Sequence, residues 1–478
     1  MHWIDITIFV VYMIAMLGVG FFFMKSNSSK EDYYLAGRNM GPWHIGFSVV
    51  ATDVGGGFSI GLGGLGFVMG LSGSWMLFTG LVGAWLATVF LIPKVFELGR
   101  KVNLFTFPQI FEQIFNKKVA LIAAGISAIG YLGFTASQML AGAKLAHATF
   151  PSVSLNNALL IMGIIAVVYT VMGGLKAVIY TDTIQWIILL SGLIFIGLPM
   201  GYYAIGGWEG ISASVSPEML SLTNLNWQDM VNWSVTIIPI WFIGMTLYQR
   251  IYASRDVKQA RKAWYIAGVF EWPVMAFMGV LLGLFARVAA DQGMFTDVGY
   301  ATATAMDPEI GLPLLLRTIL PIGLMGLMMS AYFSAILSTA DSCLMACSGN
   351  VVTDLLYTSK YFRNRDEMKL SQLATLGIGA AAILIALFME NVLELMLHSY
   401  AFMVSGLFLP VLYGLYSRRP YATAAMASML AGGGVTLTLT ILKTKLPFGL
   451  DPIIFGLIAA LVVLIIVDKL KPAFSSPT

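Results

Sequence analysis

Four acidic residues interrupt long apolar stretches of the sequence, where a charge is expensive. They are Asp53, Asp182, Glu271 and Asp341, and none has an obvious lysine or arginine partner within its own stretch. A charged side chain at the centre of a membrane helix costs at least about 2.5–3.5 kcal/mol on insertion scales. A buried carboxylate without a basic partner must bind a cation, bind a proton or accept several hydrogen bonds. We therefore interpret these four residues as candidates for cation chemistry.

The stretch that contains Asp341 also carries the densest group of hydroxyl side chains. It reads Ser338-Thr-Ala-Asp-Ser342. On a helix, Ser338, Thr339 and Ser342 share one face with Ala335. Sodium is a hard cation that prefers oxygen ligands, so this group favours a sodium site. The alternative is ordinary packing, in which each hydroxyl bonds the carbonyl four residues back.

Two apolar stretches are interrupted by residues that form helices poorly. In the first, Asp53 is followed by Gly55-Gly-Gly57, and in the second, Pro239 precedes Gly244. Glycine costs about 1 kcal/mol relative to alanine in a helix interior. Unwound backbone at membrane depth is tolerated only where it is buried in protein or lines a cavity. Close packing of helices through small residues is the alternative, but it does not account for the aspartate.

A substrate cavity is predicted between these two interruptions. The candidate lining residues, chosen by position, are Asp53, Gly55, Gly56, Phe134, Gln138, Trp241 and Gly244. Phe134 and Trp241 would offer aromatic faces to an ammonium group, although each is also a common packing residue. Because no arginine is predicted deep within a span, a substrate carboxylate would rely on helix N-termini.

The composition is that of an integral membrane protein in contact with lipid. Of the 478 residues, 58% are hydrophobic and 11% are charged, and the mean hydropathy is +0.83. A soluble domain carries about 25% charged residues. The net charge of +3 gives no reason to expect a nucleic-acid partner, and the four histidines are scattered without a nucleophile motif. An enzyme is therefore not expected.

We predict an all-α protein with thirteen transmembrane helices, since each needs about 20 mostly apolar residues. The predicted spans are 6–24, 43–69, 74–98, 119–148, 155–172, 178–205, 232–251, 264–288, 320–354, 371–390, 398–416, 421–442 and 452–468. The connections at 206–231 and 289–319 are each long enough for a short surface helix.

The interrupted spans are the second and the seventh, and this spacing suggests two five-helix halves. An odd number of spans inserted twice in series must be inverted, as in inverted-repeat transporters. The predicted parts are an extra N-terminal helix with a cytoplasmic loop, a first repeat, an external loop, a second inverted repeat and two C-terminal helices. Their ranges are 1–40, 41–205, 206–231, 232–417 and 418–478.

Basic residues predict the orientation in the cell membrane. With the N-terminus outside and the C-terminus in the cytoplasm, most of the 27 lysines and arginines, Arg250 included, fall on the cytoplasmic side. The few on the outside are Lys144, Arg287, Arg317, Lys443 and Lys445.

Three motifs occur in order along this chain: Asp32-Tyr-Tyr-Leu-Ala-Gly-Arg38, Met172-Gly-Gly-Leu-Lys-Ala-Val-Ile-Tyr-Thr-Asp-Thr-Ile-Gln185 and Ser338-Thr-Ala-Asp-Ser342. With them, the chain resembles the sodium:solute symporters, particularly the proline and pantothenate permeases and the choline-transporter type. The resemblance implies the LeuT-like fold of two inverted five-helix repeats, each with a broken first helix. It also implies sodium-coupled symport of a small organic solute by alternating access, with an amino acid, choline or betaine, or a carboxylate as the solute.

The resemblance further implies ion sites. The sodium ligands would be the carbonyls of Ala51, Val54 and Ala335 and the hydroxyls of Ser338 and Thr339. Some relatives hold a second sodium ion at the positions of Asp182, Asp341 and Ser342. Because Asp341 replaces a hydroxyl there, a second cation and a proton held between Asp182 and Asp341 are alternatives. Two further readings are a proton-coupled symporter that uses this aspartate pair and a substrate-sensing transporter homologue.

Overall fold

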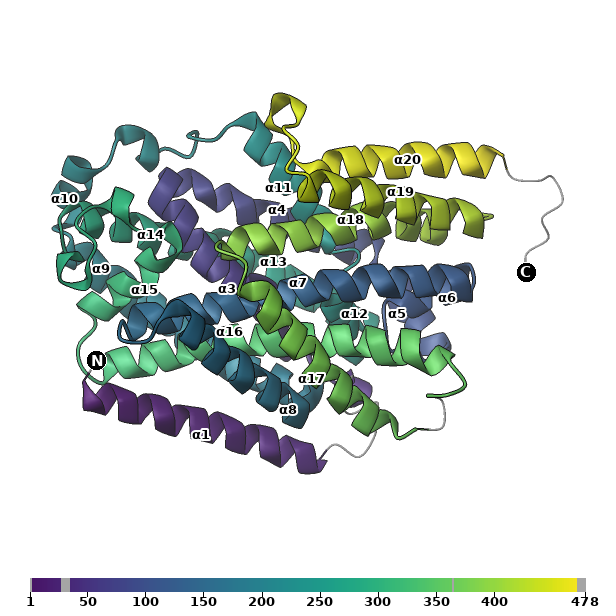
Figure 1. Ribbon diagram of the computed structural model, residues 1–478, viewed down its shortest axis with the longest axis horizontal. Coiled ribbons are helices and arrows are strands. Elements are labelled where there is room, and N and C mark those ends of the chain that lie inside the picture. Colours follow the sequence, from purple (N-terminus) through teal and green to yellow (C-terminus); the bar gives the residue numbers. More distant parts are fainter. Residues whose placement is uncertain (1, 27–34, 363–364, 471–478) are drawn as a thin grey trace.

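The computed structural model describes residues 2–26, 35–362 and 365–470, and this part of the chain is built from helices. Figure 1 shows long helices lying side by side, with short helices and loops gathered at the ends of the bundle. The first of the three sequence motifs begins outside the described residues, since Asp32, Tyr33 and Tyr34 are not among them. The prediction of an all-α chain is confirmed for the described part.

The longer helices follow the predicted apolar stretches. They are α1 (Trp3–Ser26), α3 (Pro42–Met69), α4 (Trp75–Phe90), α7 (Lys117–Thr149), α8 (Leu155–Gly192), α11 (Trp227–Ile240), α12 (Met245–Ala253), α13 (Val257–Val269), α14 (Ala276–Asp291), α16 (Leu324–Gly349), α17 (Glu367–Ala386), α18 (Val392–Tyr416), α19 (Ala422–Ile441) and α20 (Pro452–Lys469).

Shorter helices connect them or cover the ends of the bundle. They are α5 (Ile92–Lys101), α6 (Pro108–Ile114), α9 (Leu198–Ala204), α10 (Gly207–Ser214) and α15 (Pro308–Ile319), together with short 3-10 and π segments. The prediction of a short helix in each of the connections 206–231 and 289–319 is confirmed by α10 and α15.

Within the described residues, nine helical segments are long and apolar enough to cross a membrane. The bent pair α11 and α12 makes a tenth, and Trp3–Met16 and Leu155–Val171 are shorter apolar helices. Apolar residues cover these helices on most sides because lipid and neighbouring helices are both apolar surroundings. The chain is therefore an all-helical, multi-pass membrane protein.

Both predicted interruptions are present in the structure. In α3 the break is concentrated at Gly55, whose φ of +30° lies in a region that suits glycine. Helical backbone continues on both sides of it, so the break is a sharp kink rather than an unwound loop. In the second interruption α11 ends at Ile240 and α12 begins at Met245, with a bend of 41° between the two helices.

The helix α16 lies at the centre of the bundle and packs against α1, α3, α7 and α8. Almost all of its side chains are buried, including the hydroxyls that the sequence singled out. The pair α19 and α20 packs together and against α18 at one edge of the bundle, as Figure 1 shows. The centre of the molecule, where the broken helices meet α16, is thus the place where polar chemistry is shielded from lipid.

Candidate functional site

The kink in α3 rests directly on α16. The Thr339 hydroxyl donates to the carbonyl oxygen of Ala51 at 2.9 Å and also lies 3.2 Å from that of Ala335. A Cβ atom added at Gly55 would collide with the Thr339 side chain. Glycine is therefore required at this position both by its φ angle and by the close approach of the two helices.

Most of the predicted sodium ligands are brought together at this contact. Ala51, Ala335 and Thr339 share hydrogen bonds, as described above, whereas the side chain of Val54 lies outside the described residues. The Ser338 hydroxyl is turned to one side, where it donates to Asp182. The arrangement supplies carbonyl and hydroxyl oxygens from two different helices, which are the ligands that a sodium ion prefers.

A second polar cluster lies one helical turn further along α16, at Ser342, and it contradicts part of the prediction made from the sequence. Arg250, predicted at the cytoplasmic end of the span 232–251, is completely buried in α12, and its Nη2 atom lies 3.7 Å from Oδ2 of Asp182. The same atom donates to the hydroxyls of Ser48 at 3.1 Å, Thr52 at 2.8 Å and Ser342 at 2.9 Å. The predictions that Asp182 lacks a basic partner and that no arginine lies deep within a span are therefore wrong.

The physical reason for this correction is the break between α11 and α12. Because α12 starts anew at Met245, Arg250 lies in its second turn and faces the polar side of α3, which carries Ser48 and Thr52. The Ser48 hydroxyl connects the charges, since it accepts from Arg250 and donates to Asp182 at 2.5 Å. A guanidinium group offers five donors in a fixed plane, which suits this ring of oxygens.

Asp182 and Asp341 have different partners. Both oxygens of Asp182 are engaged, by Ser48 and by Ser338. Oδ1 of Asp341 accepts from Thr170 at 2.5 Å, and Oδ2 has no hydrogen-bond partner among the described residues. The two carboxyl groups are therefore not hydrogen-bonded to each other in this conformation.

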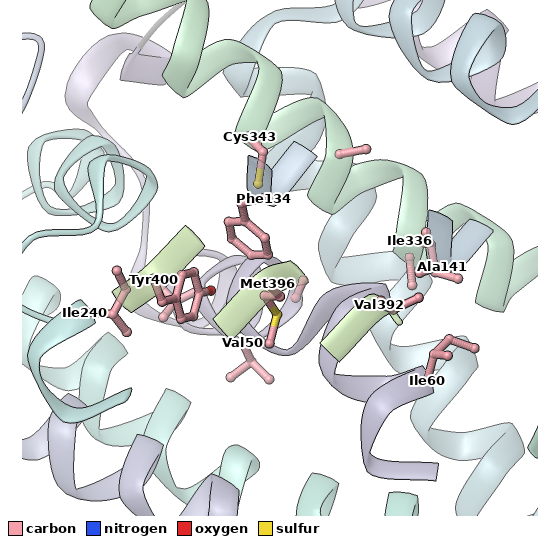
Figure 2. Packing of buried hydrophobic residues seen from close by; sticks show 14 of the residues in the cluster. Val50, Ile60, Phe134, Ala141, Ile240, Ile336, Cys343, Val392, Met396 and Tyr400 are labelled. Atoms are coloured by element: carbon pink, nitrogen blue, oxygen red, sulfur yellow. The ribbon is translucent and has the colours of Figure 1, made fainter. Parts of the chain in front are cut away.

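Several predicted substrate residues gather on the other side of the kink. The Oε1 atom of Gln138 in α7 accepts from the backbone N–H of Gly56 at 3.0 Å. One turn earlier in α7, Phe134 packs edge-on against Tyr400 of α18, with 4.9 Å between ring centroids. Figure 2 shows both rings in one buried cluster with Met396.

The break between α11 and α12 faces the same helix, α7. The backbone N–H of Thr246 donates to the hydroxyl of Tyr131 at 3.1 Å, and Gly244 is the N-cap residue directly before α12. Trp241 is completely buried, and a Cβ atom at Gly83 of α4 would collide with its ring. Its indole N–H has no acceptor among the described residues. Both breaks therefore contact α7, and buried aromatic side chains lie beside them.

Asp53 lies on α3 just before the kink and is almost fully buried. Its carboxyl group is in side-chain contact with that of Glu271, which belongs to the π-helical segment η5 (Phe270–Met275) between α13 and α14. Oδ2 of Asp53 and both oxygens of Glu271 receive no hydrogen bond from the described residues. The structure therefore adds Glu271 to the surroundings of the predicted substrate site.

A cavity of about 480 Å³ lies at one end of the bundle, above this centre. Among its lining residues are Gly61 and Leu65 of α3, Glu309 of α15 and Ala401 of α18. Ala401 follows Tyr400, whose ring packs on Phe134. The volume of the cavity lies in the range of small-molecule sites, and we call it the vestibule.

A buried ion pair fixes the wall of this vestibule. Lys144 of α7, only 2% exposed, lies 2.5 Å from Asp307 and 2.6 Å from Glu309. Glu309 also accepts from the backbone N–H groups of Val392 and Leu393 at the start of α18. One lysine thus ties together α7, the loop before α15 and the first turn of α18.

Replacing Lys144 with methionine is expected to loosen this wall. The variant leaves the Glu309 carboxylate buried without its cation, and lost charge-assisted hydrogen bonds of this kind are worth about 1.5–3 kcal/mol. Thermal unfolding in detergent should show a clear fall in melting temperature, whereas Lys94→Met, which changes a lysine that bonds a surface carbonyl, should show little. Equal melting temperatures for the two variants would contradict this role of Lys144.

The sequence pattern missed three of these residues. Arg250, Tyr131 and Tyr400 each belong to the centre, but none was singled out as a site residue from the sequence. A signal for Arg250 existed in its position only a few residues after the Pro239–Gly244 interruption, where a new helix begins. Tyr131 stands three residues before Phe134 in the same helix, so the helical period would have placed it on the same face.

The chain is similar to known proteins over most of its length. The model of the sodium:solute symporter family matches residues 33–432. The sodium/glucose cotransporter of Vibrio parahaemolyticus is 28% identical, over 97% of this chain and 90% of that protein. The high-affinity proline transporter PutP of Bacillus subtilis is 27% identical, over 88% of this chain and 89% of that protein. A Na⁺-coupled sialic acid symporter solved in a substrate-bound outward-open state shares the fold, with a TM-score of 0.79 and 21% identity over 98% of both chains.

Proposed function

The chain belongs to the sodium:solute symporter family, and from this premise we propose how its residues bind the coupling ion and the solute. It is a sodium-coupled symporter of a small solute and not an enzyme. Sodium is the coupling ion, and the protein crosses the membrane several times.

The sodium site is proposed at the contact between the α3 kink and α16. Its ligands are the carbonyls of Ala51, Val54 and Ala335 and the hydroxyls of Ser338 and Thr339. The observation that carries this proposal is the bond from Thr339 to the Ala51 carbonyl, because it joins a break in one half of the chain to a helix of the other. An ion held here stabilises the conformation in which the two helices are in contact, which is how a gradient can bias alternating access.

At the second cation position we assign the positive charge to Arg250. Asp182 and Ser342 already surround its guanidinium group, and so a second sodium ion at these residues would have to compete with a tethered cation. Asp341 stands apart from this cluster, bonded to Thr170, and is the remaining candidate for a second cation or a proton.

The solute is proposed to bind beside the kink, below the vestibule. The residues assigned to it are Asp53, Gly55, Gly56, Phe134, Gln138, Trp241 and Gly244, with Tyr131 and Tyr400 added from the structure. The named relatives carry proline and glucose, and the mixture of amide, carboxyl and aromatic groups here suits a small amino acid, choline or betaine, or a carboxylate. The aromatic rings among these residues favour a solute with an ammonium group.

The direct test is transport by purified protein in proteoliposomes. An inward sodium gradient should stimulate uptake of at least one of labelled proline, choline, betaine, lactate and glucose, and replacing sodium with potassium should abolish the stimulation. Uptake that runs equally well without sodium for every compound would contradict the assignment.

We further propose thirteen membrane crossings, two inverted repeats at 41–205 and 232–417, an outside N-terminus and a cytoplasmic C-terminus. This arrangement is supported by the breaks in α3 and between α11 and α12 and by helices in the predicted apolar stretches, although the stretches 155–172 and 178–205 are joined in the continuous helix α8. Arg38, Lys144 and Arg250 are buried, and the proposed orientation rests on the other lysines and arginines, most of which fall in the stretches assigned to the cytoplasm.

Reporter fusions test this topology. Fusions after Arg365 and after Lys469 are both expected to report the cytoplasm, and a fusion after Ser221 is expected to report the outside. An external signal at Arg365 or Lys469 would contradict the number of crossings or the orientation.

A further inference from the structure

The chain segments that flank the two broken helices are joined to each other at one end of the bundle. The backbone N–H of Met40, just before α3, donates to the carbonyl oxygen of Ala253 at 3.0 Å, and the N–H of Arg255 donates to the carbonyl oxygen of Met40 at 3.3 Å. These bonds form a short parallel bridge between Met40 and Ser254. The vestibule is lined by Gly61, in the last third of α3. This helix therefore borders an open cavity toward one end and a closed contact at the other.

Arg100 lies across this bridge. It belongs to the last turn of α5, and its Nη2 atom donates to the carbonyl oxygens of Arg38 and Ser254, at 2.9 Å each. The carbonyl oxygen of Arg255 lies 3.3 Å from the same atom. Because Ser254 is the C-cap of α12, the positive charge of Arg100 also meets the negative end of that helix dipole. One side chain thus ties the start of α3 and the end of α12 to α5.

The helix α5 is itself packed closely against α12. A Cβ atom added at Gly99 would collide with the ring of Tyr252, so the backbone of α5 touches this buried ring directly. A second arginine extends the connection, since Nη2 of Arg38 donates to the carbonyl oxygen of Leu104, shortly after α5, at 2.8 Å. The loop before α3, the end of α12 and the end of α5 therefore form one hydrogen-bonded unit.

The bonds of Arg100 depend on the conformation of the bundle. Its acceptors are backbone oxygens next to α3 and α12, which belong to the two proposed repeats. If these helices move apart, the bridge separates and one guanidinium group can no longer reach both carbonyls. An interaction that exists in only one of two conformations shifts the equilibrium toward that conformation. Arg100 therefore favours the state in which the centre is closed on this side.

We propose that Arg100 is a clamp for the transport cycle, which holds this side of the centre closed while the vestibule is open on the other side. It is a positioning residue, since it acts through the ends of α3 and α12. The proposal rests on the alternating access proposed for this symporter, and in the proposed topology the clamped side faces the cytoplasm. The bonds of Arg100 and the bridge at Met40 must break each time the centre opens toward α5.

Labelling of Cys343 measures this opening without sodium or solute. The thiol is completely buried one turn after Thr339 in α16, and Figure 2 shows it in the same packed cluster as Phe134. A water-soluble maleimide should modify it slowly in purified wild-type protein. In Arg100→Gln we expect labelling to be about tenfold faster or more, because each charge-assisted hydrogen bond that is lost changes the equilibrium by about this factor. Peptide mass spectrometry separates Cys343 from Cys347.

Two further variants control for charge and for geometry. Lys101→Gln removes an equal charge from the next position of α5, which is exposed, and should be labelled at the wild-type rate. Arg100→Lys keeps the charge but not the planar set of donors, and it should be labelled at a rate between those of wild type and Arg100→Gln.

Hydrogen exchange separates opening from a general loss of stability. In the same sodium-free detergent solution, Arg100→Gln should speed exchange in the segments 36–45 and 245–258 and leave 307–319 and 422–441 at wild-type rates. The clamp is ruled out if Arg100→Gln labels Cys343 at the wild-type rate, if Lys101→Gln labels it equally fast, or if exchange rises equally in all four segments.

If Arg100→Gln does not fold, Arg100→Lys decides the matter by the same criteria. Because neither sodium nor solute is present, a negative result refutes the clamp and leaves the symport assignment standing. Sodium-independent uptake in proteoliposomes would instead refute the proposed function and leave these rates unchanged.

Discussion

Replacing Arg250 with methionine is expected to destabilise the protein by about 3–5 kcal/mol, the usual cost of removing one partner of a buried ion pair. Methionine keeps much of the side-chain volume but leaves Asp182 charged and without its cation. It also removes the donor shared by the hydroxyls of Ser48, Thr52 and Ser342. The measurement is thermal or denaturant unfolding in detergent, compared with Arg255→Met, which changes an exposed arginine five residues later.

A double-mutant cycle distinguishes the charge interaction between Arg250 and Asp182 from a loss of side-chain packing. Asp182→Asn alone leaves the Arg250 charge uncompensated, whereas the Arg250→Met, Asp182→Asn double variant removes both charges. We expect the double variant to be more stable than the sum of the two single effects predicts, since coupled partners are not additive. Additive effects would contradict a charge pair between α8 and α12.

Replacing Thr339 with alanine is expected to raise the sodium concentration needed for half-maximal stabilisation about tenfold or more. The hydroxyl contacts the carbonyls of Ala51 and Ala335, so its loss removes one ligand and the bond that holds α3 against α16. A tenfold change corresponds to about 1.4 kcal/mol of binding energy. Alanine is small and favourable in a helix, so the fold without sodium should change little.

Ser338→Ala should also weaken sodium binding, and it should in addition lower the stability of the protein. Its hydroxyl donates to Asp182 in this conformation, so the variant also disturbs the Arg250 cluster. We therefore expect Ser338→Ala to lower both sodium affinity and stability, while Thr339→Ala lowers mainly sodium affinity.

Local sequence patterns were sufficient for most of the helices and for the two predicted breaks, but not for the continuous helix α8 or for the interruption η5 between α13 and α14. Glycine after Asp53 and proline before Gly244 weaken the helix at their own positions. The structure is correspondingly kinked at Gly55 and bent after Ile240. Apolar stretches of sufficient length likewise become helices because their backbone has no other way to satisfy its hydrogen bonds in lipid.

Pairings between distant helices could not be predicted in the same way. Arg250 was assigned to the cytoplasmic end of the span 232–251 because basic residues near span ends usually face the cytoplasm. Its burial depends on Asp182, far away in the sequence, and on hydroxyls from α3 and α16. Glu271 was recognised as an acidic residue within a span, but its contact with Asp53 is tertiary and leaves no trace in spacing.

The central claim, that sodium binds between the α3 kink and α16, is tested most directly by sodium-dependent thermal stabilisation of purified protein. Sodium chloride is titrated against potassium chloride at constant ionic strength for wild type, Thr339→Ala and Ser348→Ala. Ser348 is a matched control, since it is a buried hydroxyl of α16 whose bond stays within its own helix. We predict that sodium raises the melting temperature of wild type and Ser348→Ala at similar concentrations and that Thr339→Ala requires about tenfold more or does not respond. Wild-type half-saturation in Thr339→Ala would contradict the site.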